Sequence, residues 1–191
     1  MSEIGTGGAT EAGRMVEPRQ VIDFWREAGP DKWFARDEAF DARFRLAFLD
    51  AHWAASRGEL EHWADSADGA LALLLLLDQF PRNCFRSSGH AYATDPLARH
   101  YAARAVEAGF DVQVEPALRV FVYLPFEHSE DMADQQRSVE LARGLPEEYL
   151  KYAIAHLDVI ARFGRFPHRN RELGRVNTPD EQAWLDAGGG F

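Results

Sequence analysis

The most apolar stretch of the chain lies between residues 66 and 81, which read SADGALALLLLLDQFP. Its eight consecutive apolar residues, 70–77, are too few to span a membrane, since a spanning helix takes about 20. We therefore expect a buried core helix from about Ser66 to Phe80. The helix must stop or kink at Pro81, because proline removes a backbone donor and restricts the residue before it.

Helix start and stop signals recur on both sides of this stretch, whereas the alternation typical of strands is hard to find. The best defined segment is 94–109, where Thr94 can cap the start and Gly109 suits the end. We predict an all-α fold of about eight helices in antiparallel pairs. The expected helices cover about 18–29, 37–58, 66–80, 94–109, 129–144, 146–164 and a last one opened by a capping box at 178–181, with a short apolar segment at 116–124 that Pro125 stops.

The composition limits the number of domains and the partners. A chain of 191 residues suits one domain, and we expect flexible tails at 1–16 and 188–191 around a single helical domain at 17–187. Its 21 basic and 31 acidic residues give a net charge of −10, which disfavours nucleic acid and membranes as partners. One cysteine and no signal-like apolar run near residue 1 predict a cytoplasmic protein. A homodimer is left open.

Arginine is concentrated near the end of the chain. Residues 162–175 hold five arginines and one glutamate, so this segment is formally +4 in an acidic chain. The guanidinium group grips carboxylate or phosphate with two parallel hydrogen bonds. We hypothesise that Arg82, Arg165 and Arg169 line an anion-binding site. The alternatives are that the arginines pair with acidic helices, and that the similar motifs at 80–83 and 166–170 only end helices.

A second group of polar residues contains His128 and Glu130. They are interpreted either as the surroundings of a helix start, with Ser129 as the cap, or as acid–base groups. His156 lies on a helix face with apolar neighbours, and Asp78 is electrostatically misplaced if its helix ends at Phe80. The candidate catalytic residues are therefore His128, Glu130, His156 and Asp78. No metal-ligand spacing or cofactor fingerprint is found, so we expect neither a metal nor a cofactor.

Four motifs in this order resemble the bacterial and plant domain-of-unknown-function family 924, over roughly residues 21–185. They read DQFPRNCFR at 78–86, TDPLA at 94–98, YLPFEHSED at 123–131 and RFGRFPHRN at 162–170, the last followed by LGR at 173–175. The resemblance implies a tetratricopeptide-like, right-handed helical array and no assigned activity. The sequence departs from the family at Glu127, where relatives often carry a neutral residue, and at Asn177, where serine is usual. The positions that match the family pattern are Asp78, Gln79, Arg82, Asn83, Tyr123, His128, Glu130, His156, Arg165, His168, Arg169 and Asn170.

Three functions fit these residues. The leading hypothesis is a cavity that binds a small anionic molecule or a peptide carboxylate, because the concave surfaces of helical arrays are binding surfaces. The alternatives are an enzyme that uses His128 or His156 with Glu130 or Asp78 as acid–base groups, and a protein-interaction scaffold. The predicted ligand-binding residues are Arg82, Asn83, Gln79, Tyr123, Arg165, His168, Arg169 and Asn170.

Overall fold

The computed structural model describes residues 16–191, so most of the expected N-terminal tail lies outside the described residues. Over this range the chain is helical and contains no strand, which confirms the all-α prediction. The α-helices are α1 (Pro18–Ala28), α2 (Pro30–Trp33), α3 (Glu38–Ser56), α4 (Ala67–Leu74), α5 (Phe80–Cys84), α6 (Asp95–Glu107), α7 (Val120–Glu127), α8 (Met132–Ala142), α9 (Glu147–Phe163) and α10 (Pro179–Asp186).

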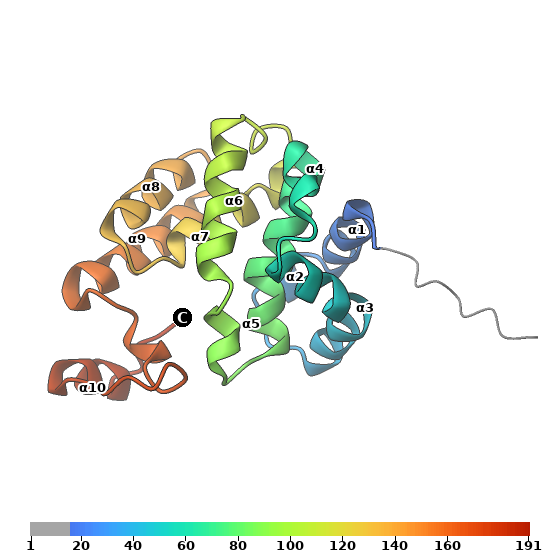
Figure 1. Ribbon diagram of the computed structural model, residues 1–191. Helices are drawn as coiled ribbons and strands as arrows, with labels where there is room; N and C mark the ends of the chain where they lie inside the picture. The colour runs from blue at the N-terminus through green and yellow to red at the C-terminus, as the bar shows by residue number, and fades with distance from the viewer. Residues whose placement is uncertain (1–15) are drawn as a thin grey trace, which may run out of the picture.

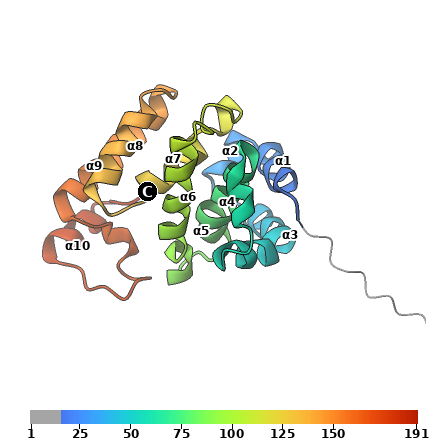
Figure 2. The ribbon, with the colours of Figure 1, turned by 45° about the horizontal axis from the view of Figure 1, so that its top comes forward.

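The helices form an array in which α6, α7 and α8 each pack against the next helix in the sequence, whereas earlier α4 packs on α1 and α5 packs on α3 (Figure 1). In two views, α1 to α5 lie on one side, α6 and α7 run through the middle, and α8 and α9 lie on the other side (Figure 2). The side chains of residues 71–77 in the apolar stretch are almost completely buried. Because α4 packs against α1, α6 and α7, this stretch is the centre of the main core. None of the helices among residues 16–191 is both long and apolar enough to cross a membrane.

The core helix neither ends at Phe80 nor stops at Pro81. It passes through one π turn, Leu75–Gln79, and continues as α5 to Cys84. Pro81 has no N–H to offer the preceding turn, and side chains from elsewhere serve the carbonyl groups there. His52 Nδ1 donates to the Leu76 carbonyl at 2.9 Å, the Thr94 hydroxyl donates to Leu77, and Arg82 Nη1 donates to Asp78 at 2.8 Å. Asp78 is therefore inside a continuous helix instead of at an electrostatically unfavourable end.

Two further boundaries differ from the sequence prediction. The expected stop at Pro125 is wrong, because this residue lies inside α7, which ends at Glu127. The expected Ser129 cap is also wrong: Asp131 caps α8 by accepting from the N–H groups of Ala133 and Asp134 at 2.8 and 3.4 Å. Ser129 instead donates to the Asp134 carboxylate at 2.7 Å. The longer α7 brings Glu127 and the adjacent His128 toward the middle of the molecule.

The C-terminal part of the chain has a small core of its own. Val159, Ile160 and Phe166 form a separate buried cluster, against which Trp184 of α10 packs. As predicted, α9 ends at Gly164, which adopts a left-handed φ of +68°, and α10 begins with the capping box of Thr178. Residues 188–191, where we expected a flexible tail, lie against this cluster, and the ring of Phe191 contacts Phe166.

Candidate functional site

A cavity of about 740 Å³ lies where the main core meets the C-terminal part of the chain. Its wall contains residues from α2, the π turn and α5, the end of α7, α9 and the segment after α9. Residues far apart in the sequence meet here. The predicted site residues that line the cavity are Gln79, Arg82, Asn83, His128, His156, His168 and Arg169.

Asp78 lies behind His128 and orients it. The Nδ1 N–H of His128 donates to Asp78 Oδ1 at 2.7 Å, and Gln79 donates to the other oxygen at 2.7 Å. Burial alone would raise the pKa of Asp78, but the charge of Arg82 and the contact with His128 lower this pKa overall. Burial and Arg82 also lower the pKa of His128, so its ring is neutral at pH 7. With the proton on Nδ1, the Nε2 atom of His128 is a proton acceptor, and it makes no hydrogen bond within residues 16–191.

Arg82 is fully engaged with carboxylates. Its guanidinium forms two hydrogen bonds with Asp95, at 2.8 and 2.9 Å, and lies 3.2 Å from Asp78 Oδ1. Burial would lower the pKa of Arg82, but Asp78 and Asp95 raise it above the usual value for arginine. Arg82 therefore stabilises the junction between α5 and α6, and its charge is neutralised within the protein.

Arg169 meets the same carboxylate but is less completely engaged. Its Nη1 donates to Asp95 at 3.3 Å and to the His128 carbonyl at 3.0 Å. The guanidinium lies 4.7 Å from the ring centre of Tyr92 and 4.4 Å from that of Phe166. Arg169 is only 5% exposed, its Nε is buried without a hydrogen-bond partner, and Nη2 has none among the described residues. Burial and the neighbouring Arg82 lower the pKa of Arg169 to about 10.

A second histidine lies beside a buried carboxyl group. His156 donates from Nδ1 to the Tyr152 carbonyl at 2.8 Å, and this nitrogen lies 3.3 Å from a carboxyl oxygen of Glu127. Burial, together with the charge of Asp78, raises the pKa of Glu127 to about 8. Burial lowers the pKa of His156 to about 3. At pH 7 this pair is mostly a neutral carboxylic acid and a neutral imidazole. The ring centre of His156 lies 6.2 Å from that of His128.

Besides Asp78, which lies behind His128, four of the predicted site residues do not line the cavity. The Tyr123 hydroxyl donates to Asp111 at 2.7 Å, and Arg165 pairs with Glu181 at 2.6 and 2.8 Å. Asn170 donates to Asn177 at 2.7 Å. Glu130 accepts two hydrogen bonds from Arg175, at 2.7 and 2.9 Å, and one from the Phe166 N–H. The contacts of Arg165, Asn170 and Glu130 hold the segment after α9 in its conformation.

Sequence reasoning missed several residues of the site. Asp95 lies in the TDPLA motif but is not among the predicted site residues, although it is the shared partner of both arginines. Glu127 drew attention as a departure from the family but was not placed in the site. Tyr92 and Phe191 gave no signal that reasoning on motifs could use, because their role depends on which rings surround them.

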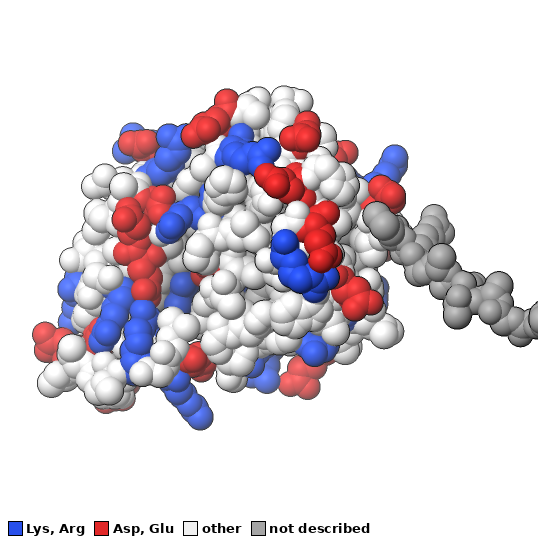
Figure 3. Space-filling view, in the orientation of Figure 1, with Lys and Arg blue, Asp and Glu red and all other residues white. Residues whose placement is uncertain are grey.

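The charges on the protein surface are mixed. In the view of Figure 3, basic and acidic side chains are interleaved over the surface instead of separating into one broad basic face. The segment at 162–175 follows the same rule, since Arg165 and Arg175 are paired with carboxylates. This pattern favours recognition of a small ligand in the cavity over recognition of a long polyanion on the surface.

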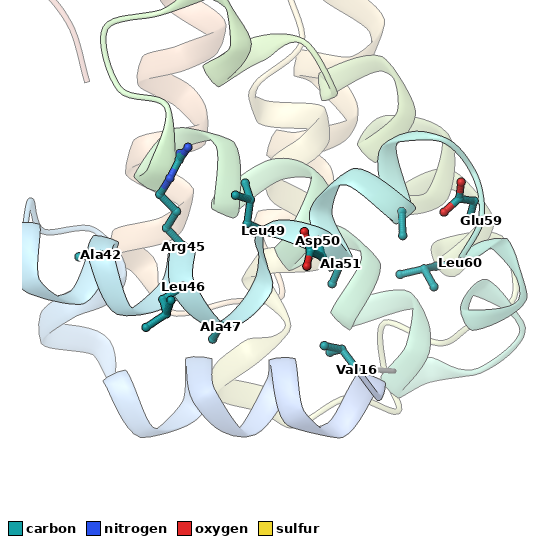
Figure 4. A pocket seen from close by; sticks show the side chains of 11 residues that line it. Val16, Ala42, Arg45, Leu46, Ala47, Leu49, Asp50, Ala51, Glu59 and Leu60 are labelled. Atoms are coloured by element: carbon teal, nitrogen blue, oxygen red, sulfur yellow. The ribbon is translucent and has the colours of Figure 1, made fainter. Parts of the chain in front are cut away.

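A larger cavity, of about 890 Å³, lies elsewhere along α3 (Figure 4). Its wall is chiefly aliphatic, with Val16 and Leu60 facing α3. Its Arg45 is engaged with the Cys84 carbonyl at 3.0 Å. It lacks the cluster of perturbed titratable groups that distinguishes the first cavity. Across residues 16–191 no group of three or more His, Cys, Asp or Glu side chains is arranged to hold a metal ion.

Comparisons with known proteins agree with the resemblance seen in the motifs. A family model described as "Bacterial protein of unknown function (DUF924)" matches residues 21–189. A solved structure of a protein of unknown function from Agrobacterium tumefaciens is 54% identical and has a TM-score of 0.88, covering 90% of this chain and 97% of that one. No curated protein matches. The tetratricopeptide-like assignment stays a prediction. Because the family model spans nearly the whole described chain, the protein belongs to the DUF924 family of bacterial proteins of unknown function.

Proposed function

We propose that the cavity binds a small anionic molecule, a carboxylate or a phosphate, and that Arg169 is its main contact. The observation that carries the proposal is the state of this side chain. Arg169 is 5% exposed, yet its Nε and Nη2 atoms have no hydrogen-bond partner among residues 16–191. A buried guanidinium with free donors is costly unless a ligand satisfies them.

The balance of charge around Asp95 supports the choice of Arg169 over Arg82. Arg82 takes both oxygens of Asp95 and lies against Asp78, whereas Arg169 has only one longer contact with the shared carboxylate. The charges of Asp78 and Asp95 raise the pKa of Arg82, whereas burial and the neighbouring Arg82 lower the pKa of Arg169. The charge of Arg169 is therefore less closely compensated than that of Arg82, and a bound anion would compensate it further.

Thermal unfolding with and without inorganic phosphate tests the proposal. Phosphate is compared with sodium chloride at the same ionic strength, for the wild type, Arg169→Met and Arg165→Met. Arg165 is a matched control because it is paired with Glu181 and does not line the cavity. We expect phosphate to raise Tm for the wild type and Arg165→Met but not for Arg169→Met. An absence of any phosphate-specific shift in the wild type, or an equal shift in Arg169→Met, would contradict the proposal.

One observation favours a second candidate, acid–base catalysis on the bound anion. A buried, ionised Asp78 fixes His128 with Nε2 as a free proton acceptor, and the pKa of Glu127 is raised to about 8, so that it can donate a proton. In ester hydrolysis, His128 would take a proton from water while the water oxygen attacks and the alcohol or phenolate leaves.

Hydrolysis of p-nitrophenyl phosphate and p-nitrophenyl acetate, followed by release of p-nitrophenolate, tests the second candidate. We expect a rate above buffer for at least one ester in the wild type and Arg165→Met, and its loss in His128→Gln. If His128→Gln matches the wild type, or the wild type shows no rate with either ester, hydrolysis is not the function of the cavity.

A further inference from the structure

The ring of Phe191 is enclosed on three sides by aromatic side chains of the cavity. It stacks on His156 with a centre distance of 3.6 Å and an angle of 12° between the planes. It meets Phe166 edge-on at 6.3 Å and 89°, and His168 at 5.8 Å and 82°. Face-to-edge and offset contacts of this kind are favourable for aromatic rings. His156 and His168 are uncharged at pH 7, because burial lowers their pKa values to about 3 and about 4.

We propose that His156, Phe166 and His168 form a subsite for a planar aromatic ring, which Phe191 fills in this structure. The inference rests on the proposed function and adds to it the class of the ligand: an aromatic ring that carries an anionic group. The chain's own Phe191 competes with the ring of that ligand, so the segment 188–191 is an autoinhibitory cover.

Phe166 joins the two parts of the site. The Arg169 guanidinium lies 4.4 Å from the centre of the Phe166 ring, and Phe191 meets the same ring at 6.3 Å. A ring in the place of Phe191 and an anion on Arg169 would thus share one neighbour. A compact ligand can reach both subsites, whereas Phe191 forms no ion pair with Arg169, whose carboxylate partner among the described residues is Asp95.

The segment before Phe191 is suited to a removable cover. Gly189 passes so close to Trp184 that a Cβ atom would lie 2.3 Å from its ring, and Gly190 has a φ of +143° that other residues rarely adopt. These glycines bring Phe191 to the cavity without forming a helix. Phe191 is still 54% exposed, so its ring can leave the subsite without unfolding the core.

Binding measurements by calorimetry on Phe191→Ala test the inference, with inorganic phosphate, phenyl phosphate and benzyl alcohol as probes. Phe34→Ala is the matched control, because Phe34 is also an exposed aromatic residue of the cavity wall but does not belong to the subsite. We expect phenyl phosphate to bind Phe191→Ala roughly three- to tenfold more tightly than the wild type. Inorganic phosphate should bind both equally, and Phe34→Ala should show no gain for phenyl phosphate.

The outcomes separate this inference from the proposed function. If phenyl phosphate and inorganic phosphate bind Phe191→Ala equally well, or Phe34→Ala gives the same gain, the aromatic subsite is overturned and the anion site stands. If inorganic phosphate binds no variant but benzyl alcohol binds Phe191→Ala and not the wild type, the subsite is supported and the anion site fails. Failure of both aromatic probes to bind Phe191→Ala overturns the subsite. Circular dichroism confirms that each variant is folded.

Discussion

Two regions of the molecule have nearly the same sequence but adopt different structures. Residues 80–83 read FPRN and residues 166–170 read FPHRN. The first lies inside a continuous helix, and the second forms a short 3-10 turn after α9 has ended. Both nevertheless direct an arginine to Asp95, at 2.8 Å for Arg82 and 3.3 Å for Arg169.

The comparison shows that the surroundings of a motif decide its role. Residues 80–83 follow the π turn of the core helix, so Arg82 is held between Asp78 and Asp95. Residues 166–170 follow Gly164, which ends α9, so the second arginine approaches Asp95 from the other side of the cavity. Because the first arginine already occupies both oxygens, the second keeps free donors. One arginine stabilises the fold, and the other remains able to bind.

Removal of the carboxylate of Asp95, which both arginines contact, should have the largest effect on stability. We expect Asp95→Asn to lower the free energy of unfolding by about 3–5 kcal/mol, because the buried Arg169 and the largely buried Arg82 lose their common partner. Urea denaturation measures the change. Glu59→Gln, which breaks an exposed pair with Arg57, is the control and should leave the free energy of unfolding nearly unchanged. A cost for Asp95→Asn no larger than that of the control would show that the pairing with Asp95 contributes little.

Removal of Arg82, the arginine of the first motif, should have the next largest effect on stability. Arg82→Met leaves the buried carboxylate of Asp78 with only neutral partners and deprives Asp95 of its two closest hydrogen bonds. We expect a loss of about 2–4 kcal/mol in the free energy of unfolding, measured in urea. Full stability in Arg82→Met would mean that Arg169 can take over both carboxylates.

The free energy of unfolding should depend on pH through Glu127, which lines the cavity. The pKa of Glu127 is about 8 in the folded protein, above the value of 4.5 expected when unfolded. Its stabilising contribution is complete below pH 4.5 and is lost as the pH rises toward 8. Between pH 6.5 and 8 the wild type should lose about 2 kcal/mol more stability than Glu127→Gln, because the other titrating groups are common to both proteins. Glu148→Gln, at an exposed position of the cavity wall, is the control and should keep the wild-type decline.

The lowered pKa of His156 predicts a pH dependence of stability with the opposite sign and at lower pH. Its pKa is lowered to about 3, so it contributes stability above pH 6.5 that is lost as the pH falls toward 3. Between pH 6.5 and 8 it adds only a small rise in stability, about 0.4 kcal/mol, because the unfolded imidazole is half protonated at pH 6.5. A decline in that window which persists in Glu127→Gln would assign the titration to another group.

The helix around the first motif depends on a donor from α6. Thr94→Val keeps the shape of the side chain but leaves the buried Leu77 carbonyl without its hydroxyl partner. We expect a loss of about 1–2 kcal/mol in the free energy of unfolding. Thr94→Ser retains the hydroxyl and should keep most of the wild-type stability. If Thr94→Val and Thr94→Ser are equally stable, the hydroxyl does not support the π turn.

Removal of the second arginine should have the smallest effect on stability. In Arg169→Met, an apolar side chain replaces a buried and incompletely paired charge, so the change should be about 1 kcal/mol or less in either direction. Urea denaturation beside Arg82→Met gives the comparison directly. A cost for Arg169→Met above that for Arg82→Met would reverse the assignment of the two arginines.

Much of the fold could be predicted from local patterns. The cap and glycine signals placed α3, α6, α9 and α10 within a few residues, because helix starts and ends depend on neighbouring side chains. The helix ends expected at Phe80 and Pro125 were wrong for the opposite reason. A proline inside a helix is tolerated when distant groups serve the carbonyls it leaves free, as Thr94 and His52 do around the π turn. The sequence of the helix itself carries no sign of them.

The candidate site divides in the same way. The sequence by itself determined the helical class, the family and the residue types, including His128, His156 and the two arginines. Only the tertiary structure decided that Asp95 meets Arg169 from 74 positions away, and that Tyr123 and Arg165 turn elsewhere. The physical reason is range: helix periodicity and caps act within one turn, whereas the state of a buried charge depends on every group that folding brings around it.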